Sequence, residues 1–200
     1  MKHLLPLLLV ACATPASVER VKILSGQQGW REGTAVLVKN TPDASYWATN
    51  AHVVEDASPQ QAAVGTLSVL TIWGVTGGGE WDDLYYVVDG AILETRPVTV
   101  PETEELLGRW VPAPGEEVSI HTTRGVLSAV MRPHAGTYQF AVLGGEGIIP
   151  GDSGSPVYAQ GKLVGLVWAS SDTRDHVGVL TPLWAIREAL SDYRMRWVLE

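Results

Sequence analysis

A serine between two glycines is the sharpest chemical signal in this chain. Residues 151–156 read Gly-Asp-Ser-Gly-Ser-Pro, and the flanking glycines allow a tight turn that exposes the Ser153 hydroxyl. Such a hydroxyl attacks a carbonyl carbon when an imidazole takes its proton and a carboxylate fixes the tautomer of that imidazole. The amides of Gly151 and Ser153 are candidates for binding the resulting oxyanion. The alternative is a plain turn, because this composition is also typical of turns.

Candidates for the base and the acid precede the serine. His52 and Asp89 give the order His, Asp, Ser, which is one of the orders in which catalytic triads occur. Each also has an ordinary interpretation, since a lone histidine is commonly just hydrogen-bonded in place and Asp89 with Gly90 is a strong hairpin signal. Asp82 and Asp83 compete with Asp89 for the role of the acid.

Short apolar runs between turn residues must position these groups. Runs rich in Val, Ile, Leu, Thr and Trp alternate with Gly, Pro, Asn and Asp, which predicts an all-β sandwich or barrel. The expected strands cover 33–39, 46–50, 66–73, 84–88, 91–95, 117–122, 126–131, 137–143, 155–159, 162–169 and 176–181.

Two further segments complete the expected fold. Three glycines at 77–79 are expected to form a flexible connection between strands. One helix is expected after the last strand, with Thr181 as its cap and Pro182 in its first turn. Its apolar face would consist of Leu183, Ile186 and Leu190.

A proline-rich stretch divides the strands into two halves. Four prolines and an acidic turn lie between Arg96 and Gly115, and proline interrupts strand pairing. We therefore expect an N-terminal β-barrel at 18–99, a linker at 100–111, and a C-terminal β-barrel with its helix at 112–200.

The composition fits one globular unit. The chain has 200 residues, of which 46% are hydrophobic, and its formal net charge is -8. This charge repels a phosphate backbone, so nucleic acid is not an expected partner. His121, His134 and His176 lack the paired spacing of metal ligands and are expected at the surface or in loops. Neither a metal nor an organic cofactor is expected.

The first residues form a candidate signal peptide. Lys2 and His3 precede an apolar run at 4–11 that is too short to span a bilayer as a helix. The sequence Leu-Val-Ala-Cys ending at Cys12 resembles the lipobox of bacterial lipoproteins, in which cleavage precedes the cysteine and its thiol is lipidated. We therefore expect removal of residues 1–11 and lipidation of Cys12.

This prediction describes an exported lipoprotein. It would face the periplasm or the cell exterior, with residues 12–17 as a tether and no other membrane contact. The alternatives are ordinary cleavage after Ala13 or Ala16, which gives a secreted protein, or an apolar tail without a targeting role. Because Cys12 is the only cysteine, no intramolecular disulfide is expected.

Three motifs together resemble one family, the chymotrypsin-like (trypsin-type) serine peptidases. Residues 151–156 resemble the nucleophile motif of this family, and the run Trp-Ala-Thr-Asn-Ala-His-Val-Val at 47–54 resembles its histidine motif. Residues 89–93, Asp-Gly-Ala-Ile-Leu, resemble its Asp-x-Ala-apolar-apolar motif. Gly90 is a departure, because a larger apolar residue is common there.

Other strands extend the resemblance to about 30–190. Residues 33–38 resemble the strand before the histidine in the disulfide-free bacterial branch, although Ala35 replaces the usual glycine. Residues 165–168 and 178–181 resemble the strands that wall the specificity pocket.

The resemblance implies two packed antiparallel β-barrels, a C-terminal helix and a triad in the cleft between the barrels. Ser153 would be the nucleophile, His52 the base and Asp89 the residue that orients the histidine, with the oxyanion held by the amides of Gly151 and Ser153. The implied activity is that of an exported serine endopeptidase acting on peptides or proteins. The alternatives are a catalytically silent binding or scaffold protein on the same fold, and an esterase or acyl-transfer enzyme.

The resemblance also locates a substrate pocket. It would be formed by Gly147, by the strand from Trp168 to Ser170, and by Gly178. No carboxylate stands at Gly147, so recognition of Lys or Arg through a buried ion pair is not supported, and a small or apolar substrate side chain is expected. Trp168 replaces a smaller polar residue and is expected to narrow the site.

Asp152 stands where digestive members of the family pair an aspartate with a newly exposed N-terminal amine. No sequence upstream resembles their Arg-Ile-Val-Gly-Gly cleavage site. We therefore expect Asp152 to have another partner and the chain to need no activation step of that kind.

Overall fold

The structure is a computed structural model that describes residues 18–25, 29–81, 84–99, 107–133, 137–172 and 176–200. The predicted signal peptide, the lipidation site at Cys12, the tether at 12–17, His134 and the competing acids Asp82 and Asp83 lie outside these residues. Within the described ranges, no helix is both long and apolar enough to cross a membrane.

The first half of the chain forms a closed barrel. Its strands pair antiparallel in the order β1-β2-β3-β6-β5-β4. Apolar side chains that alternate along these strands point inward, and Ile23, Trp47 and Leu93 are at most 2% exposed. The strands are β1 (Val18–Ser25), β2 (Gly29–Asn40), β3 (Ser45–Thr49), β4 (Ala62–Val64), β5 (Leu67–Trp81) and β6 (Leu84–Thr95).

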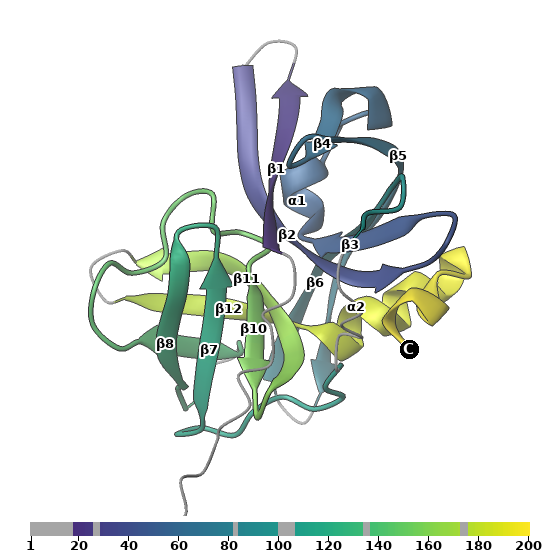
Figure 1. Ribbon diagram of the computed structural model, residues 1–200. Helices are drawn as coiled ribbons and strands as arrows, with labels where there is room; N and C mark the ends of the chain where they lie inside the picture. Colours follow the sequence, from purple (N-terminus) through teal and green to yellow (C-terminus); the bar gives the residue numbers. More distant parts are fainter. Residues whose placement is uncertain (1–17, 26–28, 82–83, 100–106, 134–136, 173–175) are drawn as a thin grey trace, which may run out of the picture.

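The second half forms another closed barrel beside the first (Figure 1). Its strand order is β10-β11-β12-β9-β8-β7, and neighbouring strands again pair antiparallel. Phe140, Ile120 and Val167 are fully buried in its core. The strands are β7 (Glu117–Thr122), β8 (Gly125–Met131), β9 (Gln139–Val142), β10 (Pro156–Ala159), β11 (Lys162–Asp172) and β12 (Val177–Pro182).

The end of the chain returns to the first barrel. Helix α2 (Leu183–Ala189) packs beside β6, and the 3₁₀ helices η2 (Leu190–Tyr193) and η3 (Arg196–Leu199) pack beside β5 and β2, respectively. Ile186 is fully buried in one cluster with Val36 and Ile92 of the first barrel and with Leu166 of the second. The predicted fold, two antiparallel barrels with a C-terminal helix, is confirmed.

The glycines at 77–79 are not a connection between strands. They lie inside β5, which pairs with β6 from Val69 to Trp81, so β5 is longer than predicted. A glycine run weakens a strand, but an antiparallel partner over its whole length supplies the backbone hydrogen bonds that the sequence alone does not reveal.

Asp89 and Gly90 do not form a hairpin turn. β6 passes straight through them, with Asp89 opposite Thr76 and Gly90 opposite Val75. Gly90 has a packing reason, because a Cβ there would lie 2.5 Å from Cγ2 of Ile186. The small residue makes room for the C-terminal helix, which explains the departure from the family motif.

Two other expectations also need correction. β1 and β4 were not among the predicted strands, because three of the eight residues of β1 are charged and β4 has only three residues. Pro182, not Thr181, precedes α2 as its N-cap. Thr181 instead belongs to β12, where it pairs with Leu166.

Candidate active site

His52 and Asp89 are joined by two contacts. The amide of His52 donates to Oδ1 of Asp89 at 2.9 Å, and Nδ1 of the imidazole lies within hydrogen-bonding distance of Oδ2. An ionised carboxylate only accepts hydrogen bonds, so Nδ1 carries the proton and Nε2 is left as an acceptor. The Asp89 side chain is 6% exposed and the His52 side chain 40%. The arrangement thus holds a partly exposed imidazole against a buried carboxylate.

Local structure explains these positions. His52 lies on helix α1 (Ala51–Val54), whose other three residues are buried and fix the helix against the barrel. The side chain of Asn50, directly before this helix, donates from Nδ2 to the Asp89 carbonyl at 2.7 Å. The histidine helix and β6 are therefore held together by both backbone and side-chain bonds.

Ser153 comes from the second barrel, in the turn before β10. Gly151 and Gly154 adopt φ values of +97° and +87°, which side chains other than that of glycine rarely tolerate. Gly154 also approaches the first barrel closely, since a Cβ there would lie 2.0 Å from the carbonyl oxygen of Thr34. Both glycines are thus required by the shape of the turn.

Two backbone amides of this turn donate no hydrogen bond to the described residues. The amides of Asp152, Gly154 and Ser155 donate to the carbonyls of Ile149, Val167 and Asp152, at 2.8–3.0 Å. Within the described part of the chain, the amides of Gly151 and Ser153 donate to no acceptor. These are the two amides that the sequence indicates as candidates for binding an oxyanion, and such a pair is available to bind a developing negative charge.

The Ser153 hydroxyl points to β11. Its Oγ donates to the carbonyl of Trp168 at 3.3 Å. Among the described residues, the Ser153 hydroxyl makes no other hydrogen bond. Trp168 lies at a β-bulge, where the pairing of β11 with β12 shifts register between Val167 and Ala169. The bond is longer than the roughly 2.8 Å typical of a hydroxyl donor, so it is weak. Because the Ser153 hydroxyl donates to the Trp168 carbonyl, it does not donate to His52 in this structure.

Asp152 has a partner that sequence reasoning missed. Its side chain, 3% exposed, accepts Nη2 of Arg124 at 2.6 Å and the amide of Ile149 at 2.9 Å. The hydrogen bond to Asp152 raises the pKa of Arg124 above its ordinary value. Arg124 also contacts Glu146 at 2.9 Å. Arg124 lies in a Thr-Thr-Arg-Gly turn between β7 and β8, and nothing in this turn sequence indicates that it pairs with Asp152.

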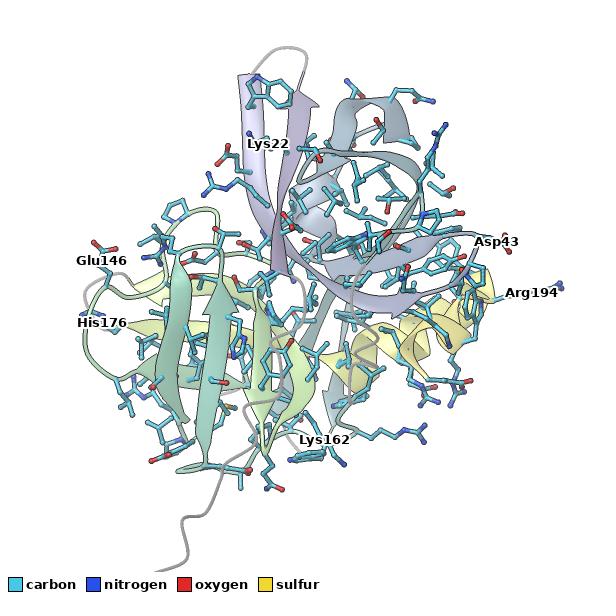
Figure 2. The ribbon with its side chains drawn as sticks, in the orientation of Figure 1. Lys22, Asp43, Glu146, Lys162, His176 and Arg194 are labelled. Carbon is cyan, nitrogen blue, oxygen red and sulfur yellow. The ribbon has the colours of Figure 1, made fainter. Side chains whose placement is uncertain are left out.

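The predicted pocket residues gather only in part. Ser170 pairs with Gly178 across β11 and β12, while the side chain of Ser170 lies outside the described coordinates. Gly147 faces His176, because a Cβ on Gly147 would lie 2.9 Å from Nδ1 of that histidine. Figure 2 shows His176 on the same side of the second barrel as Glu146.

One of the two other described histidines differs from expectation. His121 lies on β7 and is partly buried, with its ring 4.5 Å from that of Tyr158, because β7 turns this position toward β10. His176 precedes β12, and its Nδ1 is buried without a hydrogen-bond partner. The prediction that both lie at the surface or in loops is therefore wrong for His121. No group of three metal-ligating side chains occurs among the residues that the structure describes.

Comparisons with solved structures identify the architecture as the chymotrypsin-like fold. The active form of the Rv3671c protease from M. tuberculosis matches with a TM-score of 0.61 and 19% identity, over 88% of this chain and 80% of that one. The scabies mite inactivated protease paralogue S-I1 matches with a TM-score of 0.66 and 15% identity, over 90% and 94%. Kallikrein-related peptidase 10 matches with a TM-score of 0.61 and 16% identity, over 90% and 94%.

These similarities establish the fold and not the activity. The matching structures include both a protease in its active form and an inactivated paralogue. No family model and no curated protein sequence matches this chain. The function therefore has to be argued from the site itself.

Proposed function

We propose that this protein is a serine endopeptidase that uses Ser153, His52 and Asp89. The observation that carries the proposal is the buried Asp89 carboxylate, which bonds both the amide and the ring of His52. It leaves Nε2 of His52 as the acceptor that a serine nucleophile requires. Two free amides in the Ser153 turn supply the second requirement, an oxyanion site.

The reaction follows from these groups. Oγ of Ser153 attacks the carbonyl carbon of the peptide while its proton moves to Nε2 of His52. The amides of Gly151 and Ser153 hold the oxyanion, and Asp89 stabilises the imidazolium. The imidazolium then gives its proton to the leaving amine as the peptide bond breaks. Water, activated by the same histidine, hydrolyses the acyl-enzyme and restores the serine.

Ser153 must first leave the carbonyl of Trp168. A bond of 3.3 Å is easily exchanged, and catalytic hydrogen bonds are often long or unmade before substrate binds. We expect an extended substrate beside β11 to donate its own amide to the Trp168 carbonyl and so release the hydroxyl toward His52.

The substrate preference we propose is for small side chains before the scissile bond. Gly147 is too small to fill a pocket, but His176 occupies the space in front of it, and the Phe140 ring occupies the space in front of Gly178. The His176 ring would shorten the pocket, and no carboxylate is present there to bind a cation. Cleavage of a library of peptides that differ at this one position tests the preference.

A fluorophosphonate probe tests the proposed activity. Such a probe reacts with a serine only when base and oxyanion site are assembled. We expect labelling of Ser153 in the wild-type protein, located by peptide mapping, and none in Ser153→Ala or His52→Ala. Folded wild-type protein that stays unlabelled would contradict the proposal.

One observation favours a second candidate, a catalytically silent binding protein. The Ser153 hydroxyl is engaged with Trp168 and not with His52. A catalytically silent protein would hydrolyse neither esters nor peptides. Hydrolysis of esters alone would favour an esterase or acyl-transfer enzyme. A comparison of ester and peptide substrates separates these alternatives from the endopeptidase.

We also propose that the protein is exported and anchored through a lipid on Cys12. The support is the apolar run at 4–11 that ends in the Leu-Val-Ala-Cys sequence. Intact mass analysis of the mature N-terminus tests it. An unmodified N-terminus at Thr14 or Ser17 would overturn the lipid anchor and leave simple secretion.

A further inference from the structure

Thr34 of the first barrel holds two carbonyls of the serine turn. Its amide donates to the carbonyl of Ser153 at 2.8 Å, and its Oγ1 donates to the carbonyl of Gly151 at 2.9 Å. Thr34 lies on β2 and is fully buried. Thr34 of the first barrel therefore binds the Ser153 turn of the second barrel through two hydrogen bonds.

Thr34 is itself fixed from the side of the histidine. Oγ1 of Thr49 donates to its carbonyl at 2.7 Å, and Thr49 ends the strand that leads into the helix carrying His52. Gly154 packs directly against the same carbonyl. The serine turn and the histidine segment thus share one buried anchor.

These bonds fix the peptide planes around the oxyanion site. In the plane after Gly151, Thr34 binds the carbonyl and Ile149 accepts the amide of Asp152. In the plane after Ser153, Thr34 binds the carbonyl and Val167 accepts the amide of Gly154. The amide of Ser153 lies between two planes that are each held at both ends, so its direction is set by them.

We propose that Thr34 is a positioning residue for the oxyanion site, and that its hydroxyl helps to fix the direction of the Ser153 amide. This inference rests on the proposed function. Oxyanion stabilisation depends on donors that are oriented before the reaction, and small misplacements are costly. The residue acts through the turn and touches no reacting atom.

Thr34→Val tests the hydroxyl while keeping the shape of the side chain. We expect kcat to fall about 10–100-fold, less than the loss from deleting an oxyanion donor outright, with KM changed by less than about 3-fold. Thr34→Ser, which keeps the hydroxyl, should restore kcat to within about 3-fold of wild type. Thr41→Val is the matched control, because Oγ1 of Thr41 also donates to a carbonyl at 2.9 Å, in a turn distant from the site.

Hydrogen exchange of individual amides provides a readout that needs no turnover. In Thr34→Val, the amides of Asp152 and Gly154 should exchange at least about 10-fold faster than in wild type, and Thr41→Val should leave them unchanged. Unchanged exchange in Thr34→Val, or a kcat within about 2-fold of wild type, would overturn the inference. If the wild-type protein neither turns over substrate nor reacts with the probe, the proposed function fails, and exchange alone decides the role of Thr34.

Discussion

The guanidinium of Arg124 lies 2.6 Å from the carboxylate of Asp152, the residue directly before Ser153. The cation comes from a hairpin of the same barrel and not from a chain terminus. In the family that the motifs resemble, digestive members obtain this cation only after cleavage exposes a new amine. Here the pair forms between two residues within the chain.

Arg124→Ala should destabilise the protein by about 2–3 kcal/mol. Removal of one partner from a buried pair leaves an uncompensated charge, which costs about 3–5 kcal/mol when both groups are buried. The loss is smaller here because Arg124 keeps 28% exposure. Urea unfolding measures it, with Arg20→Ala as control, since Arg20 pairs with Glu32 at the surface and should lose less than about 1 kcal/mol. Equal losses in the two variants would contradict a special role for Arg124.

Asp89→Asn should lower kcat by about 10³–10⁴-fold while the protein stays folded. The amide can donate as well as accept, so it stabilises the wrong tautomer of His52 and no longer supports the imidazolium. Steady-state kinetics on a peptide or ester substrate measures the effect. Asp82→Asn and Asp83→Asn serve as controls, and a comparable loss in either one would reassign the acid.

Gly154→Ala should destabilise the protein by about 3 kcal/mol or more. A methyl group there would lie 2.0 Å from the carbonyl oxygen of Thr34, at a φ of +87°, so the two barrels would have to separate locally. Gly161→Ala is the matched control, because Gly161 has a φ of +73° but open space around it. It should cost only about 1 kcal/mol. Thermal unfolding of both variants distinguishes backbone strain from the clash between barrels.

His121 should make stability fall in mild acid. Burial lowers its pKa below the ordinary value of 6.5, so the unfolded chain binds a proton more readily than the folded protein. The contribution of neutral His121 to the free energy of unfolding is therefore complete above pH 6.5 and is lost as the pH falls below that value. The free energy of unfolding, measured in urea at about pH 7.5 and about pH 5, should decrease less in His121→Gln than in wild type. An equal decrease in both proteins would show that His121 is not responsible.

The fold was predictable because strand patterns are local. Alternating apolar residues and turn residues located most of the strands, and the proline-rich stretch together with the family resemblance indicated two barrels. What was missed depends on distant partners. β1 becomes a strand by pairing with both β2 and β4, and the glycines of β5 are held by β6.

The candidate site was predictable only where motifs exist. His52 and Asp89, 37 positions apart, are in contact, and the turn around Ser153 leaves free the two amides named from the sequence. Thr34 and Arg124 were not foreseen. Their partners lie 117 and 28 positions away, and neither a threonine in a strand nor an arginine in a hairpin turn identifies a distant carbonyl or carboxylate.

The return of the C-terminal segment to the first barrel has a consequence for synthesis on the ribosome. Ile186 fills the space above Gly90, and residues of α2 and η3 share one apolar cluster with β2 and β6. The first barrel is translated first, yet part of its apolar surface stays uncovered until residues 183–199 emerge, roughly 5–20 s after Gly90 at ordinary elongation rates. During that interval the nascent chain exposes this apolar surface, and a chaperone that binds it would prevent association with other chains.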